Sequence, residues 1–278
     1  MRFSLFKEYG ALNSKPVFEA FEHSLRAAGH TVTESDMHSD VAVIWSVLFH
    51  GRMSGNKPIW DYYTRTGRKV IVLEVGGIQR GTTWKVGLNG VNRDAYFGET
   101  GNDDVRANML GLELKPWRED GEYILICGQH DKSLQWRNQP SMSNWFMQTY
   151  DKIRKHTDRP IIFRPHPRCR LPHIELGLKY VYRQDPKYIE GTYDDFDILF
   201  DNIWATISWS SNSGIHSVID GVPAFVGPSS LAYDVAGHYL QHIEHPTTPH
   251  RQQWLNDYAW TEFTVEEIAQ GIPLERLT

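Results

Sequence analysis

Short apolar runs alternate with amphipathic segments along most of the chain. The runs predict strands, and the segments between them, which carry apolar residues at helical spacing and end at Gly, predict helices. In the first half we expect strands over residues 2–6, 40–45 and 69–75 and helices over 16–28 and 58–66. Strands separated by helices of this length are typical of βαβ units and a parallel sheet.

The same pattern begins again after a stretch rich in Gly, Asn and Asp near residues 98–121. In this second half we expect strands over 123–127, 160–164, 204–208 and 223–226 and helices over 143–155, 194–199 and 214–220. The pattern therefore predicts an α/β fold of two Rossmann-like halves facing across a cleft, with boundaries at 1–110 and 120–247.

The last segment, residues 248–278, has a different pattern and predicts a helical tail that packs back on the body. We expect helices over 251–255 and 260–268. Thr264 and Glu267 have the spacing of a capping box, which marks the start of a helix.

Composition narrows the class of protein. The chain is 40% hydrophobic and 13% aromatic, which is enough for a buried core, and its net charge of −5 argues against a dedicated nucleic-acid module. That charge is still compatible with a local basic cleft. Cys127 and Cys169 lack metal-ligand spacing, and no apolar run reaches the ~18 residues of a membrane span. We therefore expect a cytoplasmic protein that does not enter a membrane.

Small polar residues follow the predicted strand 204–208, in the order Ser210, Ser211, Asn212, Ser213, Gly214. A helix is expected to start there, and the free N–H groups of a helix start attract anions such as phosphate. Ser and Asn are also favoured at helix caps for purely local reasons. The run alone is compatible with either role.

A second motif follows the predicted strand 160–164, where Arg164, His166 and Arg168 alternate with two prolines. The prolines stiffen the turn, and arginine can grip a phosphate with two parallel hydrogen bonds. A lone His-Pro pair is more often a solvated surface turn. Two such motifs, each directly after a predicted strand, favour a shared anion site.

These motifs together resemble the C-terminal half of glycosyltransferases of the two-Rossmann GT-B type, in particular capsule-polysaccharide transferases and small phage transferases. The resemblance rests on Arg164-Pro165-His166-Pro167 and on the serine run followed by Gly221-Val222-Pro223. It implies a nucleotide-sugar donor as co-substrate. The donor-binding residues that it implies are Gly128, Arg164, His166, Arg168, Ser210, Ser211, Asn212, Ser213, Gly214, His216 and Tyr233. His216 stands where many relatives carry a ribose-binding Glu, which leaves the nucleotide open.

For catalysis we expect a base in the N-terminal half, and Glu74, His50 and Glu8 are the candidates. No metal is expected. Asp195 and Asp197 fall in a predicted helix rather than at a strand end. His238, His242 and His245 lack the H-E-x-x-H pattern of a zinc helix.

The acceptor is the least constrained part. The resemblance to phage proteins favours duplex DNA with a hydroxymethylated pyrimidine. Positive and aromatic residues of the N-terminal half are compatible with gripping a backbone and stacking an extruded base. They are Arg52, Arg65, Arg68, Arg80, Lys85, Arg93, Trp60, Tyr62, Tyr63 and Trp84. An ordinary mixed surface explains them equally well. A glycan acceptor, an epimerase-like enzyme and a non-catalytic nucleotide binder of the same architecture stay open.

Overall fold

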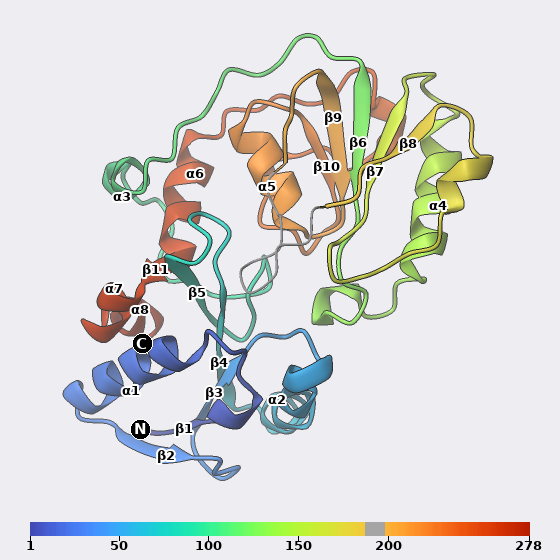
Figure 1. Ribbon diagram of the computed structural model, residues 1–278. Coiled ribbons are helices and arrows are strands. Elements are labelled where there is room, and N and C mark those ends of the chain that lie inside the picture. Colours follow the sequence, from blue (N-terminus) through green and yellow to red (C-terminus); the bar gives the residue numbers. More distant parts are fainter. Residues whose placement is uncertain (187–197) are drawn as a thin grey trace. The chain divides into compact units, whose positions relative to one another are not determined.

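The chain divides into two compact α/β units. A computed structural model describes residues 1–186 and 198–278 (Figure 1). Unit 1 comprises Met1–Gly111, Lys132–Leu134 and Asn256–Thr278, and unit 2 comprises Leu112–Asp131 and Gln135–Leu255. Each unit has its own sheet with a parallel core. The prediction of an α/β fold with two Rossmann-like halves is therefore confirmed.

Unit 1 contains a six-stranded sheet in the order β11-β5-β4-β3-β1-β2. Strands β1 to β4 run parallel, whereas β5 and β11 are antiparallel to their neighbours. The strands are β1 (Arg2–Leu5), β2 (Thr31–Glu34), β3 (Val41–Trp45), β4 (Lys69–Val75), β5 (Thr83–Leu88) and β11 (Glu262–Thr264). The helices are α1 (Lys15–Ala27), α2 (Asn56–Arg65), α3 (Val105–Met109), α7 (Val265–Ala269) and α8 (Ile272–Leu277), and α6 (Gln252–Tyr258) spans the boundary with unit 2.

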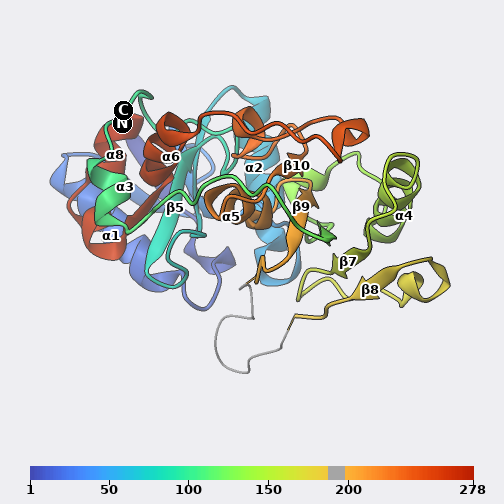
Figure 2. The same cartoon turned by 90° about the horizontal axis from the view of Figure 1, so that it is seen from above.

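Helices cover both faces of the unit 1 sheet, and the central strands β3 and β4 are apolar at almost every position. On one face Ile44 and Val72 pack against Ile59 and Tyr63 of α2. On the other face Phe18 of α1 lies against Trp45. Helices α7 and α8 lie beside α1 (Figures 1 and 2). Such double coverage explains why these strands read as continuous apolar runs.

Unit 2 contains a five-stranded sheet in the order β10-β9-β6-β7-β8, and all of its neighbouring strands are parallel. The strands are β6 (Tyr123–Cys127), β7 (Ile161–Arg164), β8 (Val181–Arg183), β9 (Ile203–Ser208) and β10 (Ala224–Val226), and the main helices are α4 (Met142–Ile153) and α5 (Asn212–Ile219).

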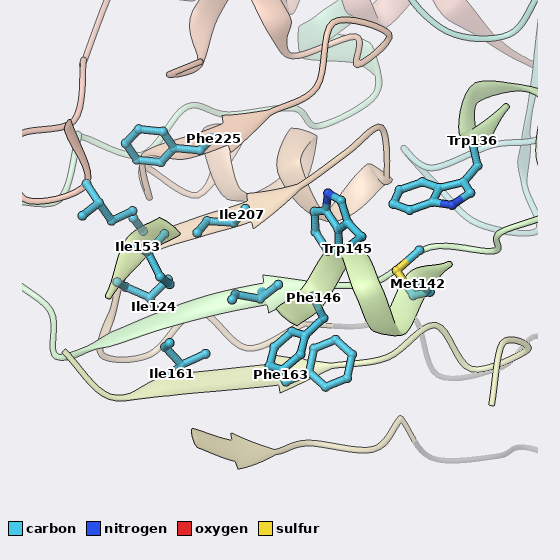
Figure 3. Close-up of a cluster of buried hydrophobic side chains, with 13 residues drawn as sticks. Ile124, Trp136, Met142, Trp145, Phe146, Ile153, Ile161, Phe163, Ile207 and Phe225 are labelled. Atoms are coloured by element: carbon cyan, nitrogen blue, oxygen red, sulfur yellow. The ribbon is translucent and has the colours of Figure 1, made fainter. Parts of the chain in front are cut away.

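The two helices of unit 2 cover opposite faces of its sheet. On the α4 face, Trp145 and Phe146 pack on side chains that include Ile124, Phe163 and Ile207 (Figure 3). Leu125 and Cys127, which alternate with Ile124, belong to a separate apolar cluster. The hydroxyl of Ser217 in α5 donates to the Thr206 hydroxyl, one position before Ile207. Because strand side chains alternate between faces, α5 lies on the side opposite α4.

The tail corrects one expectation. Residues 260–268 were expected to be helical throughout, but Glu262–Thr264 form β11, with Phe263 opposite Trp84 of β5. The helix starts only at Val265, where the Thr264–Glu267 capping box is confirmed. Phe263 is 1% exposed. Pairing with a sheet edge that is distant in sequence therefore overrode the local helical pattern.

Arg106 of α3 holds the tail in unit 1. Its guanidinium forms an ion pair of 2.7 Å with Glu267 and donates to the carbonyl oxygens of Ala259 and Glu262. It also lies 4.7 Å from the ring centres of both Trp260 and Phe263. The side chain is buried, so one cation satisfies several backbone and side-chain groups of the tail at once.

Besides β11, the sequence analysis missed strands β2, β5 and β8. Strands β2 and β8 lie at sheet edges and are short and only partly buried, so they lack an apolar run. Strand β5 contains Lys85 and Gly87, which mask its burial in the pattern. The helix expected at 194–199 falls largely outside the described residues.

Candidate functional site

The topology of unit 2 indicates a candidate ligand-binding position at the carboxyl ends of its central strands. The chain leaves β6 through α4 towards β7, and it leaves β9 through α5 towards β10. Strands β6 and β9 are neighbours, so the two connections diverge at their carboxyl ends. Open α/β sheets bind ligands at such a switch point. The loops after β6 and β9 therefore form the floor of the candidate site.

A glutamine joins these two loops. The Oε1 atom of Gln129 accepts hydrogen bonds from the backbone N–H of Ser210 at 2.9 Å and from its hydroxyl at 3.1 Å. Both residues are buried. Sequence analysis missed Gln129, although its position directly after Gly128 and an apolar strand was a usable signal. The bond fixes the start of the serine run relative to β6.

The serine run leads into α5 as expected. Ser211 is the N-cap residue, and its hydroxyl accepts from the N–H of Ser213 at 3.4 Å. A Cβ on Gly214 would lie 2.8 Å from Ser208 Oγ and 2.9 Å from a methyl carbon of Val226. Glycine therefore lets the first turn of α5 approach the sheet closely. The N–H groups of that turn give the site the positive end of the helix dipole.

The turn after β7 adds cationic and imidazole groups. Arg164 is buried as the last residue of β7, and its carbonyl accepts from the Gly128 N–H at 2.9 Å. Nδ1 of His166 accepts from the Arg168 N–H at 3.1 Å, which leaves Nε2 to carry the ring proton. The His166 ring meets His130 edge-on, with centroids 5.7 Å apart. His130, like Gln129, was missed by sequence analysis.

The structure thus brings the loops after β6, β7 and β9 together at one edge of the sheet. Asn212 is half-buried in the first turn of α5, Ser213 is buried, and His216 lies one turn further on and is half-buried. Arg168 is exposed. Tyr233 follows β10 in a 3-10 helix and stacks on His238, with ring centroids 3.7 Å apart.

In unit 1, Glu74 lies near the carboxyl end of β4 and faces Lys85 of β5. Its Oε1 accepts from the Val75 N–H at 2.8 Å, and the Ser46 hydroxyl also bonds the carboxylate. Burial raises the pKa of Glu74 above its ordinary value, and burial lowers the pKa of Lys85. A carboxyl group with a raised pKa at a strand end has the character of a general base or acid.

Ser46, which sequence analysis missed, is the backbone outlier beside Glu74. It follows β3 directly, is 1% exposed and has φ of 65°. Left-handed conformations of non-glycine residues cost free energy and cluster at functional sites. Here the conformation lets the hydroxyl reach both the Leu48 N–H, at 2.9 Å, and Glu74.

The other two candidate bases have more open surroundings. Glu8 is exposed in the 3-10 helix Lys7–Tyr9 after β1 and accepts from the Ser35 hydroxyl at 2.8 Å. His50 is exposed just before the 3-10 helix Gly51–Gly55. Of the three, Glu74 is the least exposed, and its carboxylate is held by hydrogen bonds from Val75 and Ser46.

A buried carboxylate also shapes the turn after β4. Glu262 of β11 accepts from the N–H groups of Gly77 at 2.7 Å and Ile78 at 2.9 Å and from the Thr83 hydroxyl at 2.8 Å. It is 0% exposed. No local signal could have identified it, because its partners lie far away in sequence.

Two interpretations of the basic and aromatic residues in the N-terminal half were open, and the structure opposes a DNA-gripping surface for several of these residues. Trp60, Tyr63, Trp84 and Lys85 are all buried, so they cannot stack an extruded base or reach a phosphate backbone. The guanidinium of Arg68 lies over the rings of Tyr62 and Tyr63 and donates to the Met37 carbonyl. Trp60 and Tyr63 belong to the core because α2 packs on the sheet, and Trp84 is buried within strand β5 of that sheet.

Among the described residues, no group of three or more His, Cys, Asp or Glu side chains has metal-binding geometry. Asp195 and Asp197 lie outside the described residues. Within that same described part, no helix is long and apolar enough to cross a bilayer.

Comparison with known proteins gives fold-level matches. No protein-family model matches the sequence, and no curated protein matches it. Among solved structures, the chain is similar to the beta Kdo 2,7 transferase of KpsC from Thermosulfurimonas dismutans, with a TM-score of 0.54, 15% identity and coverage of 99% of each chain. It is also similar to the beta Kdo 2,4 transferase of KpsC from the same organism, with a TM-score of 0.53, 12% identity and coverage of 98% of each chain. The chain therefore has the GT-B-like α/β fold of these transferases over nearly its whole length.

Proposed function

We propose that this protein is a glycosyltransferase that moves a sugar from a nucleotide-sugar donor to a hydroxyl group of a glycan. The observation that carries the proposal is the switch point of unit 2, where Gln129 fixes Ser210 beside the start of α5 and the turn that holds Arg164 and His166. The fold likeness to two Kdo transferases supports the same class.

In this proposal, unit 2 binds the donor phosphate. The phosphate oxygens accept hydrogen bonds from the N–H groups at the start of α5, from the Arg164 guanidinium and from the Nε2–H of His166. During transfer, the acceptor oxygen bonds to the anomeric carbon as the bond from that carbon to the phosphate oxygen breaks. The phosphate keeps the electron pair of the broken bond. The same N–H groups and the Arg164 guanidinium stabilise its added negative charge without a metal.

Glu74 is our proposed base for the acceptor hydroxyl. Its carboxylate would take the proton that the hydroxyl loses as the new glycosidic bond forms. The raised pKa of Glu74 suits this role, because a base whose pKa approaches the working pH accepts a proton more readily in the transition state. Ser46 would act as a positioning residue for that carboxylate.

A glycan acceptor replaces duplex DNA as our leading hypothesis. Both similar transferases are Kdo transferases by name, and three of the four aromatic residues that would have stacked an extruded base, Trp60, Tyr63 and Trp84, are buried. An epimerase-like enzyme would instead consume the donor with no acceptor, and a nucleotide binder would consume nothing.

Donor binding is the first test. Calorimetry on the full chain with a panel that includes CMP-Kdo, UDP-sugars and GDP-sugars should find one nucleotide class that binds. Arg164→Ala should weaken that binding by at least about tenfold, since a hydrogen bond to a charged group contributes about 1.5–3 kcal/mol. Arg164→Lys should restore part of it, and Arg137→Ala, an exposed arginine of the same unit, should have no effect.

Transfer is the second test. The donor that binds is incubated with acidic and neutral oligosaccharides and with hydroxymethylated and unmodified DNA duplexes, and products are weighed by mass spectrometry. A mass gain on an oligosaccharide alone is the expected result. A gain on hydroxymethylated DNA, or donor turnover without any acceptor, would replace our proposal with one of its alternatives.

A further inference from the structure

Unit 2 contains a cavity on the side of its sheet that α4 covers. Its volume is about 490 Å³, within the usual range of ligand sites. It is bordered by α4 and by the segment from His238 to Gln241, and Ile207 and Phe225 line it from the sheet. These two residues belong to the apolar cluster under α4, so the cavity opens on the α4 face (Figure 3). We call it the α4 groove.

One wall of the α4 groove is a rigid aromatic surface. The indole N–H of Trp209 donates to the Gln135 carbonyl at 2.9 Å, and its ring meets Trp136 edge-on. A Cβ on Gly227 would lie 2.5 Å from the Trp209 ring, so the glycine lies directly against the indole. Trp145 also lines the groove, and Tyr239, 68% exposed, adds an aromatic ring at its rim.

The polar lining of the groove is cationic and rich in amides. Lys152 and Lys155, near the end of α4, contribute positive charge, and Gln139, Gln148 and Gln241 contribute amide groups. No acidic residue lines the groove. This is notable in a chain with 34 acidic and 29 basic residues.

The two lysines have no ion pair within the described part of the chain, unlike Lys7, Lys57 and Lys115, which pair with carboxylates. Lysine at the end of a helix is favourable by itself, because it complements the helix dipole. The helix dipole does not explain the rest of the lining. Aromatic rings and amide groups lie in the same cavity as these lysines, whereas, among the described residues, carboxylates are absent from its lining.

We propose that the α4 groove binds a short acidic oligosaccharide. Aromatic faces stack against the apolar faces of sugar rings, glutamine amides bond to sugar hydroxyls, and the two lysines complement carboxylates on the sugar units. The lining of the α4 groove reaches Ser208 and Trp209, just before the serine run. The groove itself lies on the face of the sheet that α4 covers, whereas α5 covers the opposite face. It is therefore a second carbohydrate site, which goes beyond the transfer site proposed above and needs no donor to be filled.

The test uses the full chain and defined probes without donor. Calorimetric titration with trigalacturonic acid should show binding that weakens as salt is added, because salt screens exposed charges. Maltotriose, a neutral trisaccharide, should bind at least about tenfold more weakly, and sodium sulfate should not displace the trimer at equal concentration. Equal binding of maltotriose, displacement by sulfate, or no binding of the trimer at millimolar concentration would each overturn the proposal.

Variants locate the binding on the groove. The double variant Lys152→Gln/Lys155→Gln should weaken trigalacturonic acid binding at least about tenfold, and Tyr239→Ala should weaken it with both lysines present. All three residues are exposed, so the fold should be retained. The matched control is Lys179→Gln, because Lys179 is an exposed lysine of unit 2 that does not line the groove. Unchanged affinity in the double variant would refute the α4 groove as the binding site.

The two proposals can fail separately. The groove variants should bind nucleotide sugars with unchanged affinity, and Arg164→Lys should bind trigalacturonic acid with unchanged affinity. The protein could bind no nucleotide sugar and still bind trigalacturonic acid in a way that depends on Lys152 and Lys155. In that case only the transferase proposal fails. If groove variants lose donor binding as well, the groove is part of the donor site and the second-site inference is wrong.

Discussion

The Oε1 atom of Gln129 accepts two hydrogen bonds from Ser210, a residue 81 positions later in the chain. The bonds join the loops that follow two neighbouring parallel strands, β6 and β9. Because both residues are buried, the amide oxygen satisfies two donors that water cannot reach. The Gln129 side chain thus fixes the position of Ser210, just before the start of α5. The first prediction tests how much these bonds contribute to stability.

Gln129→Leu should lower the free energy of unfolding by about 1–3 kcal/mol, because it leaves the Ser210 N–H and hydroxyl buried without a partner. Urea denaturation measures the change. Gln148→Leu, at an exposed position of α4, should change stability by much less. A similar loss in both variants would mean that the Gln129 bonds do not matter to stability.

Arg106→Met should lower the free energy of unfolding by about 3–5 kcal/mol, because it removes one partner of a buried ion pair and leaves Glu267 uncompensated. The tail of unit 1 should also become sensitive to proteolysis. Arg65→Met, on the exposed side of α2, is the control. A protease-resistant tail and an unchanged urea midpoint in Arg106→Met would show that Arg106 does not hold the tail.

Glu74→Gln should change how stability depends on pH. Burial raises the pKa of Glu74 above 4.5, so the folded protein holds this proton more tightly than the unfolded chain does. The carboxyl group is therefore most favourable to folding below pH 4.5 and becomes less favourable as the pH rises through its raised pKa. Wild type should lose more stability than Glu74→Gln over that window, whereas the exposed Glu19→Gln should follow wild type.

The same substitution tests the proposed base. Glu74→Gln should bind the nucleotide sugar with unchanged affinity but lose transfer activity. The rate of the wild type should rise with pH through the raised pKa, because the base acts only when it is deprotonated. Full activity in Glu74→Gln would move the role to His50 or Glu8.

Cys127 should resist thiol reagents in the folded protein. Burial raises the pKa of its thiol to about 11, so the reactive thiolate is scarce at neutral pH and the side chain is also enclosed. Mass spectrometry after labelling should find Cys127 unmodified until denaturant is added. Modification at the same rate with and without denaturant would show that unit 2 opens.

Transfer activity should survive excess chelator, because the proposed donor site stabilises the leaving phosphate with protein groups alone. The activity is measured with and without a chelator and then with added magnesium or manganese. Loss with the chelator and recovery with either ion would refute a metal-independent reaction.

The sequence determined the elements that bury apolar residues on both faces. The largely apolar runs of β3, β4 and β6 are stable only inside a covered sheet, so the local pattern was sufficient to predict these strands. The Thr264–Glu267 capping box was readable for the same reason, since its hydrogen bonds close within one turn. The serine run and the turn around His166 were identified because each follows such a strand directly.

Tertiary structure alone decided the rest. Strand β11 exists because Phe263 pairs opposite Trp84, and Glu262 is buried because it caps a turn 185 positions away. Trp60, Tyr63 and Trp84 had the composition of a binding surface, but packing placed them in the core. Gln129, His130 and Ser46 follow apolar strands in the sequence, but the partners that they contact are brought close only by the fold. Hydrogen bonds and burial between distant segments leave no periodic trace in the sequence, since each depends on a partner that local pattern cannot specify.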